Sequence, residues 1–282
     1  MSFMELSETV NQKMFSIILA TYNCGQKVEN TLLSILSQNK ELFELIVLDG
    51  ASTDNTLDYI KKYENNLTLI SEKDDGVYDA FNKGIDKAIG KYIYFIGAGD
   101  RLQPGVLEKV KEFLPQDSPT FVYGDFYLMK QKIYESKKFR SSDLIFNNIC
   151  HQAIFYHRDI FDIIGKYDSQ YKVFADWIFN LKCFTQQGIS KQYIPCLIAD
   201  FEEGGLSSEL NNDPAFKKDF PRLVKRQLGV SAYLKCKAFL INPTLFSYCY
   251  NAGYTLLGHL ISFARPPVRG YRYMKKAIRN KT

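Results

Sequence analysis

Short apolar runs alternate with amphipathic stretches through the first hundred residues of the chain. Branched and aromatic side chains dominate the runs, and apolar positions recur about every 3.6 residues in the stretches between them. The pattern predicts strands at 15–23, 43–50, 67–72 and 92–100, separated by helices at 26–38, 55–64 and 77–89. Because strands joined through helices run in the same direction, we expect an α/β fold with a Rossmann-like, mostly parallel central sheet flanked by helices.

The second part of the chain follows a less regular pattern. Apolar runs predict three more strands, at 121–129, 152–158 and 191–201, and amphipathic spacing predicts helices at 176–188 and 214–228. Between them, the segment 202–213 has the Gly, Ser and Asn content of a loop.

Composition excludes several classes of protein. The 282 residues are 46% hydrophobic and 24% charged. This composition is too apolar for a disordered chain and lacks the enrichment in charged residues that is typical of a coiled coil. Six cysteines form neither a C-x-x-C pair nor a compact Cys/His cluster, so we expect reduced thiols in a cytosolic protein. The first fifteen residues lack the apolar core of a secretion signal, and we therefore expect no secretion.

Charge is distributed unevenly, although the net charge is only +5. Residues 1–221 carry 24 basic and 31 acidic side chains, whereas residues 222–282 carry 12 basic and no acidic ones. Residues 238–264 are uncharged and mostly apolar, and seven Lys and Arg residues interleaved with aromatic ones follow. This order is typical of segments that lie at the interface of an anionic membrane.

We call residues 238–282 the C-terminal arm and expect it to contact an anionic membrane surface. The alternatives are two helices packed on the body, or an interface of a homo-oligomer. Nucleic-acid binding is not expected, because the body is acidic and no recognition motif is present.

Acidic residues follow the predicted strands, at the edge where parallel sheets bind ligands. Asp49 ends a strand that is expected to be buried, where a carboxylate needs hydrogen-bond donors or a ligand. Asp74 and Asp75 precede the helix at 77–89, where a solvated acidic turn is an equally good explanation.

A turn of small residues, Gly97-Ala98-Gly99-Asp100, follows the fourth strand. It is not a dinucleotide-binding loop, because the third glycine of that motif would fall on Leu102. The turn leaves room for a ligand beside Asp100, whose carboxylate can hold a divalent cation.

Two further candidates lie near the middle of the chain. Asp176 opens a predicted helix, where it is either a capping residue or a catalytic base. His151 and Gln152 precede a predicted strand, where structural hydrogen bonding is the default explanation.

Taken together, these segments resemble the family 2 glycosyltransferases with the GT-A fold, in the branch that builds bacterial surface polysaccharides. The resemblance runs from Phe15 to about Ser208. It depends on six segments in the family's order: SIILATYN, VLDGASTDNT, SEKDDGVYDAFNKGI, YIYFIGAGD, CHQAIFYHR, and FADW followed by EEGGLSS.

The resemblance implies an inverting transfer of a sugar from a nucleotide-sugar donor, a UDP-sugar in our interpretation, to a glycan or lipid-linked glycan. It implies that Asp176 is the catalytic base and that Asp100 binds Mg²⁺ or Mn²⁺. Donor nucleotide contacts would come from Thr21, Tyr22, Asn23, Asp49, Asp74 and Asp75. Acceptor or donor-sugar contacts would come from His151, Gln152 and Trp177, and a loop with Gly204, Gly205 and Ser207 would close over the diphosphate.

The chain departs from the family at one point. Where the common D-x-D motif has two metal-binding Asp residues, this chain has Gly97 and Gly99, and only Asp100 remains. The departure keeps a second hypothesis open, a nucleotide-sugar-binding protein without transfer activity.

We therefore predict a GT-A catalytic domain over 1–230 and a helical, basic, aromatic-rich and membrane-associating extension over 231–282. The expected location is the cytoplasm, peripheral on the inner face of the cytoplasmic membrane.

Overall fold

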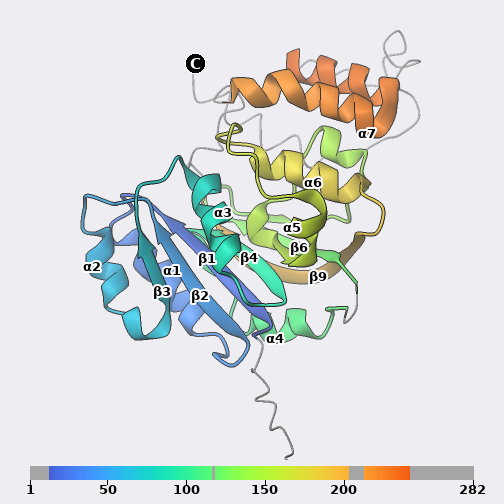
Figure 1. Ribbon diagram of the computed structural model, residues 1–282. Helices are drawn as coiled ribbons and strands as arrows, with labels where there is room; N and C mark the ends of the chain where they lie inside the picture. The colour runs from blue at the N-terminus through green and yellow to red at the C-terminus, as the bar shows by residue number, and fades with distance from the viewer. Residues whose placement is uncertain (1–12, 116–117, 203–212, 242–282) are drawn as a thin grey trace, which may run out of the picture.

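The computed structural model describes residues 13–115, 118–202 and 213–241 (Figure 1). Within them, nine strands form one sheet in the order β3-β2-β1-β4-β8-β6-β9-β5, with β7 paired to β6. The strands are β1 Phe15–Thr21, β2 Phe43–Asp49, β3 Thr68–Ser71, β4 Tyr92–Gly97, β5 Arg101–Leu102, β6 Thr120–Leu128, β7 Ile133–Glu135, β8 Ile154–His157 and β9 Ser190–Phe201.

Helices cover both faces of the sheet (Figure 1). The α-helices are α1 Lys27–Leu36, α2 Thr56–Lys61, α3 Val77–Lys87, α4 Val106–Lys111, α5 Asp159–Ile164, α6 Ala175–Thr185 and α7 Pro214–Ile241. Three short 3₁₀ turns complete the described elements: η1 Glu64–Asn66, η2 Asp143–Ile145 and η3 His151–Ala153.

The first four strands form the parallel half of the sheet. Strand β1 lies between β2 and β4, and β3 pairs with the outer edge of β2, all in parallel. Along β1, Ile18 packs into the core below α3, whereas Ile17 and Leu19 pack into the core below α1 and α4. Two buried faces explain why β1, β2 and β4 read as continuous apolar runs in the sequence, whereas β3 at the edge is partly exposed.

Beyond β4 the sheet becomes mixed. Strand β8 is antiparallel to both β4 and β6, whereas β9 runs parallel to β6 with two irregularities between Tyr123 and Phe126. The predicted mostly parallel sheet thus describes the first half of the chain, and antiparallel pairs enter where the sequence pattern becomes less regular.

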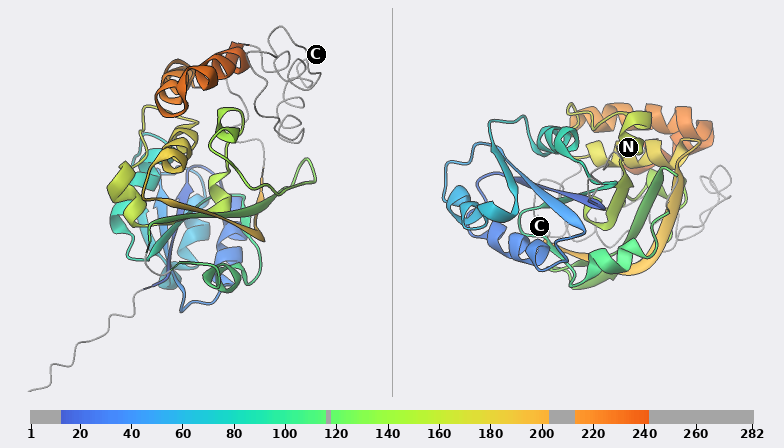
Figure 2. Two further views of the ribbon diagram at one scale, coloured as in Figure 1. Left: turned by 90° about the vertical axis from the view of Figure 1, so that its right-hand side faces the viewer. Right: turned by 60° about the horizontal axis from the view of Figure 1, so that its bottom comes forward.

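Helix α7 extends across the domain boundary that the sequence predicts at residue 230. It is kinked at Gly229, and beyond that residue Ala232, Cys236 and Phe239 remain buried in the same core as α6. Both views in Figure 2 place α7 outside α6, on the side away from the sheet. The described part of the extension therefore packs on the body, and the boundary itself stays a prediction.

No helix within the described residues has both the length and the apolar character needed to cross a membrane. Most of the C-terminal arm, residues 242–282, lies outside the described residues.

Candidate functional site

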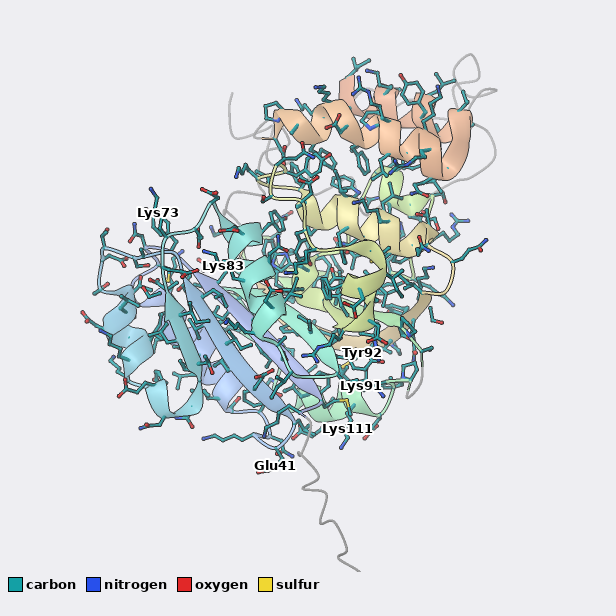
Figure 3. All side chains as sticks on the ribbon, viewed as in Figure 1. Glu41, Lys73, Lys83, Lys91, Tyr92 and Lys111 are labelled. Carbon is teal, nitrogen blue, oxygen red and sulfur yellow. The ribbon has the colours of Figure 1, made fainter. Side chains whose placement is uncertain are left out.

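The carboxyl ends of the parallel strands meet at one end of the molecule. In Figure 3 this end lies near Lys73 and Lys83, opposite Lys91 and Tyr92, where β4 begins. The polar residues that the sequence places after each strand are therefore brought to one edge.

Asp49 lies at the centre of this edge and is only 2% exposed. The strand register aligns it with Thr21 on β1 and Ser71 on β3. Both hydroxyls donate to its carboxylate, at 3.1 and 2.8 Å, and Ser52 donates through its backbone N–H at 2.9 Å and its hydroxyl at 2.5 Å. Four neutral donors compensate for the burial of this charge, as a carboxylate in that position requires.

The segment after β1 is tied to the segment after β2. Asn23 has a left-handed backbone, with φ of 43°, and its side-chain oxygen accepts a hydrogen bond from the Thr53 N–H at 2.8 Å. Tyr22, next to it, is 65% exposed. The arrangement leaves an aromatic ring free beside Asp49, available for a planar ligand such as a nucleobase.

The structure distinguishes Asp74 from Asp75. Asp74 accepts a hydrogen bond from the Gly76 N–H at 3.0 Å, and a Cβ added to Gly50 would lie 2.8 Å from Asp74 Oδ2. Asp74 is therefore packed against the turn that follows Asp49. Asp75 is exposed and contacts Asp79 and Lys172 through its backbone.

Asp100 is buried at the end of the Gly97–Asp100 turn, with 4% of its surface exposed. Gln152 Nε2 donates to its Oδ2 at 2.6 Å, and the Glu202 N–H donates to its Oδ1 at 2.9 Å. Burial raises the pKa of the Asp100 carboxyl from 3.8 to about 6, and the two hydrogen bonds oppose that rise. The site thus holds a carboxylate that lacks a full counter-charge.

This raised pKa predicts a pH-dependent contribution to stability. Asp100 binds a proton more tightly in the folded than in the unfolded chain, so its contribution is fully present below about pH 4 and is lost as the pH rises through about 6. In chelator, we expect the unfolding free energy of the wild type to rise relative to Asp100→Ala by about 2 kcal/mol between pH 7 and pH 4. Urea denaturation at several pH values measures this difference, and parallel curves for the two proteins would contradict it.

Asp176 lies in the first turn of α6 and is 6% exposed. Asn148 Nδ2 donates to its Oδ2 at 3.0 Å, and the Trp177 N–H lies 2.8 Å from its Oδ1. The Tyr78 hydroxyl lies 2.9 Å from Oδ1 and 2.8 Å from Val173 O, and its one hydrogen can serve either acceptor. Burial, followed by the charge of Asp176, raises the pKa of Tyr78 well above its usual range, so this hydroxyl remains a donor.

Asp176 is not the helix cap that the simpler interpretation proposed. The N-cap position of α6 is Phe174, which makes no side-chain capping bond. The carboxylate instead faces Tyr78, Asn148 and His151, whose Nδ1 lies 3.5 Å from Asp176 Oδ2. Asp176 is thus a buried carboxylate that faces side chains from three other segments.

Turn η3 lies between the two carboxylates. His151 approaches Asp176, while Gln152, the next residue, holds Asp100. The Cys150 thiol donates to Gln152 Oε1 at 2.5 Å, which orients the amide so that its NH₂ group points toward Asp100. Both residues of this sequence-predicted pair are thus placed at the site, in contact with carboxylates.

The remaining predicted residues have different locations. Trp177 is buried against Phe174, Phe216 and Phe220, and its indole N–H donates to Leu144 O at 2.6 Å, so its ring faces the core. Gly204, Gly205 and Ser207 lie outside the described residues.

Several contributors were missed by the sequence interpretation. Ser52, Ser71 and Asn148 carry no signal in a single sequence, because short polar side chains are common at strand ends and in loops. Tyr78 lies within the predicted helix at 77–89 and was given no role of its own. Glu202 lies in the predicted loop, directly after β9, but its contact with Asp100 was not foreseen.

Comparison with known proteins agrees with this arrangement. The family model described as glycosyl transferase family 2 matches residues 16–176. A PGL/p-HBAD biosynthesis glycosyltransferase of Mycobacterium tuberculosis is 39% identical over 225 residues, which cover 77% of this chain and 87% of the relative. The putative teichuronic acid biosynthesis glycosyltransferase TuaG of Bacillus subtilis is 33% identical over 122 residues, covering 42% of this chain and 48% of TuaG.

Solved structures share the fold at low sequence identity. S. aureus TarS, residues 1–349, crystallised with UDP-GlcNAc, has a TM-score of 0.65 at 17% identity and covers 94% of this chain and 80% of its own. The mannosyltransferase PcManGT from Pyrobaculum calidifontis, in complex with GDP-Man and Mn²⁺, has a TM-score of 0.56 at 16% identity. The match covers 95% of this chain and 87% of PcManGT. The mixed sheet with helices on both faces is that of the GT-A glycosyltransferases, and the chain belongs to glycosyltransferase family 2.

Proposed function

We propose that this glycosyltransferase moves a sugar, with inversion, from a UDP-sugar to a hydroxyl of a glycan or lipid-linked glycan in surface-polysaccharide synthesis. One observation carries the proposal. Three buried carboxylates, Asp49, Asp100 and Asp176, lie along the carboxyl edge of the sheet, and turn η3 contacts the last two. This arrangement supports a donor held at one end and a proton acceptor at the other.

Each end of the edge has its own role in the proposal. The ring of Tyr22 and the Asp49 turn, with Asn23 and Asp74, hold the nucleoside. Asp176 accepts the proton of the attacking hydroxyl, because it is a carboxylate whose partners among the described residues are neutral donors or His151. A single displacement from the side opposite the diphosphate then inverts the anomeric carbon.

A divalent cation fits beside Asp100. Within the described part of the chain, no three His, Cys, Asp or Glu side chains gather to hold a metal by themselves. Mg²⁺ and Mn²⁺ sites of nucleotide-dependent enzymes take only one or two carboxylates and complete their shell with phosphate oxygens and water. Bound there, the cation would neutralise charge on the departing diphosphate.

Relatives support the finer parts of the proposal. TarS was crystallised with UDP-GlcNAc, and PcManGT with GDP-Man and Mn²⁺. The relatives named for PGL/p-HBAD and teichuronic acid biosynthesis support an acceptor that is a glycan or a lipid-linked glycan.

The test is acceptor-dependent release of UDP. We expect one UDP-sugar of a panel to release UDP only when a suitable lipid-linked acceptor is present, and the new linkage to have the opposite anomeric configuration by NMR. GDP-sugars and dTDP-sugars serve as control donors, which differ from the UDP-sugars in the nucleotide. Donor binding without release for every acceptor would favour the non-catalytic alternative instead.

We further propose that the C-terminal arm and the outer face of α7 hold the enzyme on an anionic membrane. Val230, Leu234 and Ile241 are exposed on this helix, between 50 and 79%, and Lys225 and Arg226 are exposed on the same helix. Exposed apolar and basic side chains on one helix support binding at the interface of an anionic bilayer.

Replacing the seven basic residues after Ala264 by glutamine tests this proposal without shortening the chain. Each contributes roughly 1 kcal/mol near an anionic surface before screening, so we expect binding to anionic vesicles to weaken and to lose most of its salt dependence. Vesicle sedimentation at two salt concentrations measures both effects, with neutral vesicles as the control. A wild-type protein that ignores anionic vesicles at low salt would contradict the membrane role.

A further inference from the structure

Glu202 lies beside the position where the family motif has lost a carboxylate. Strand β5 pairs antiparallel with the end of β9, with Arg101 opposite Asp200 and Leu102 opposite Ala199. The same register, continued past Arg101, places Glu202 opposite Gly99. The hydrogen bond from the Glu202 N–H to Asp100 Oδ1, at 2.9 Å, fixes this approach.

The side chain of Glu202 occupies the space that a side chain at position 99 would need. A Cβ built on Gly99 would lie 2.2 Å from Glu202 Oε2, closer than two non-bonded atoms can approach. Gly99 also has φ of 106°, which disfavours any other residue. The glycine therefore admits the Glu202 carboxylate to the turn that ends in Asp100.

An ion pair is the alternative explanation for this carboxylate. Glu202 Oε1 lies 3.1 Å from Lys27 Nζ, but the lysine side chain is 63% exposed. Exposed pairs of this kind contribute little to stability. The pair also uses Oε1, whereas Oε2 is the oxygen beside Gly99.

We propose that Glu202 is the second carboxylate of the divalent-cation site and replaces the Asp that the D-x-D segment lacks at position 99. The inference rests on the proposed function, because the cation shell is complete only with a nucleoside diphosphate. The two acidic ligands then come from separate strands: Asp100 precedes β5 and Glu202 follows β9.

Calorimetric titration of Mn²⁺ into the full-length protein with saturating UDP tests this inference without relying on activity. We expect Glu202→Gln, which keeps size and hydrogen bonding but removes the charge, to weaken Mn²⁺ binding by at least about tenfold. Lys27→Met is the matched control, because it removes the same ion pair but no ligand. Its Mn²⁺ affinity should equal or exceed that of the wild type.

The outcomes separate the inference from the function on which it rests. If UDP binding by the wild type does not depend on Mn²⁺, the proposed cation and this inference both fail. If the wild type depends on Mn²⁺ and Glu202→Gln binds it equally well, or Lys27→Met loses as much, only the inference fails. Thermal melting verifies folding. Should Glu202→Gln not fold, Glu202→Ala replaces it in the titration, and wild-type affinity there would overturn the proposal.

Discussion

Replacing Asp176 by asparagine is expected to lower sugar transfer by about 10²-fold or more while donor binding persists. Asparagine has nearly the same shape, but its amide cannot take a proton from the acceptor hydroxyl. The one oxygen of asparagine can take the place of Oδ1 and still accept from Tyr78 and the Trp177 N–H, although the bond from Asn148 to Oδ2 is lost. The loss should therefore appear in kcat and only slightly in the donor KM.

Initial rates of UDP release and calorimetric titration of UDP provide the two measurements. Asp213→Asn is the matched control, because Asp213 is another buried carboxylate and, among the described residues, it accepts from the backbone N–H groups of Val173, Phe174 and Phe216. We expect it to cost about 1 kcal/mol of stability but to leave the turnover of folded protein unchanged. Near-normal turnover of Asp176→Asn would mean that the base lies elsewhere.

Asp100→Ala is expected to abolish the dependence of UDP affinity on Mn²⁺ and to lower transfer by about 10²-fold or more. The neighbours Gly97, Ala98 and Gly99 offer no side chain that could replace the lost carboxylate. The substitution also removes the acceptor of Gln152 Nε2 and of the Glu202 N–H, so the end of β9 loses its anchor to this turn.

UDP titrations with Mn²⁺ and with chelator measure the effect. Asp200→Asn is the control on the same strand pair, since Asp200 accepts a hydrogen bond from Gln103 Nε2 at 2.7 Å and, within the described residues, makes none with Asp100. Its Mn²⁺ dependence should match the wild type. Full activity of Asp100→Ala in excess chelator would refute a cation role, and basic side chains would then have to neutralise the diphosphate.

The parallel half of the fold could be predicted from the sequence because its signals are local. Apolar runs and 3.6-residue spacing are properties of adjacent residues, and they located β1 to β4 and the three helices between them within a few residues. The apolar pattern placed the end of β4 less accurately. The strand was predicted over 92–100, but β4 ends at Gly97, where the small-residue turn begins.

The candidate carboxylates could also be found from the sequence, because a charged residue at the end of an apolar run requires a partner. The burial of Asp49, Asp100 and Asp176 agrees with that requirement. Their partners could not be found in the same way. Ser71, Asn148 and Tyr78 are distant in sequence, and nothing in their local pattern indicates which carboxylate they meet.

Only the tertiary structure decided how these segments meet. Strand pairing places Glu202 beside Gly99 across about a hundred residues of chain, and η3 between Asp100 and Asp176. Such contacts depend on which strands are neighbours and in what register, because a shift of one residue turns every side chain to the other face. A single sequence specifies the periodicity of each element, whereas neighbours and register follow from the packing of both cores around the whole sheet.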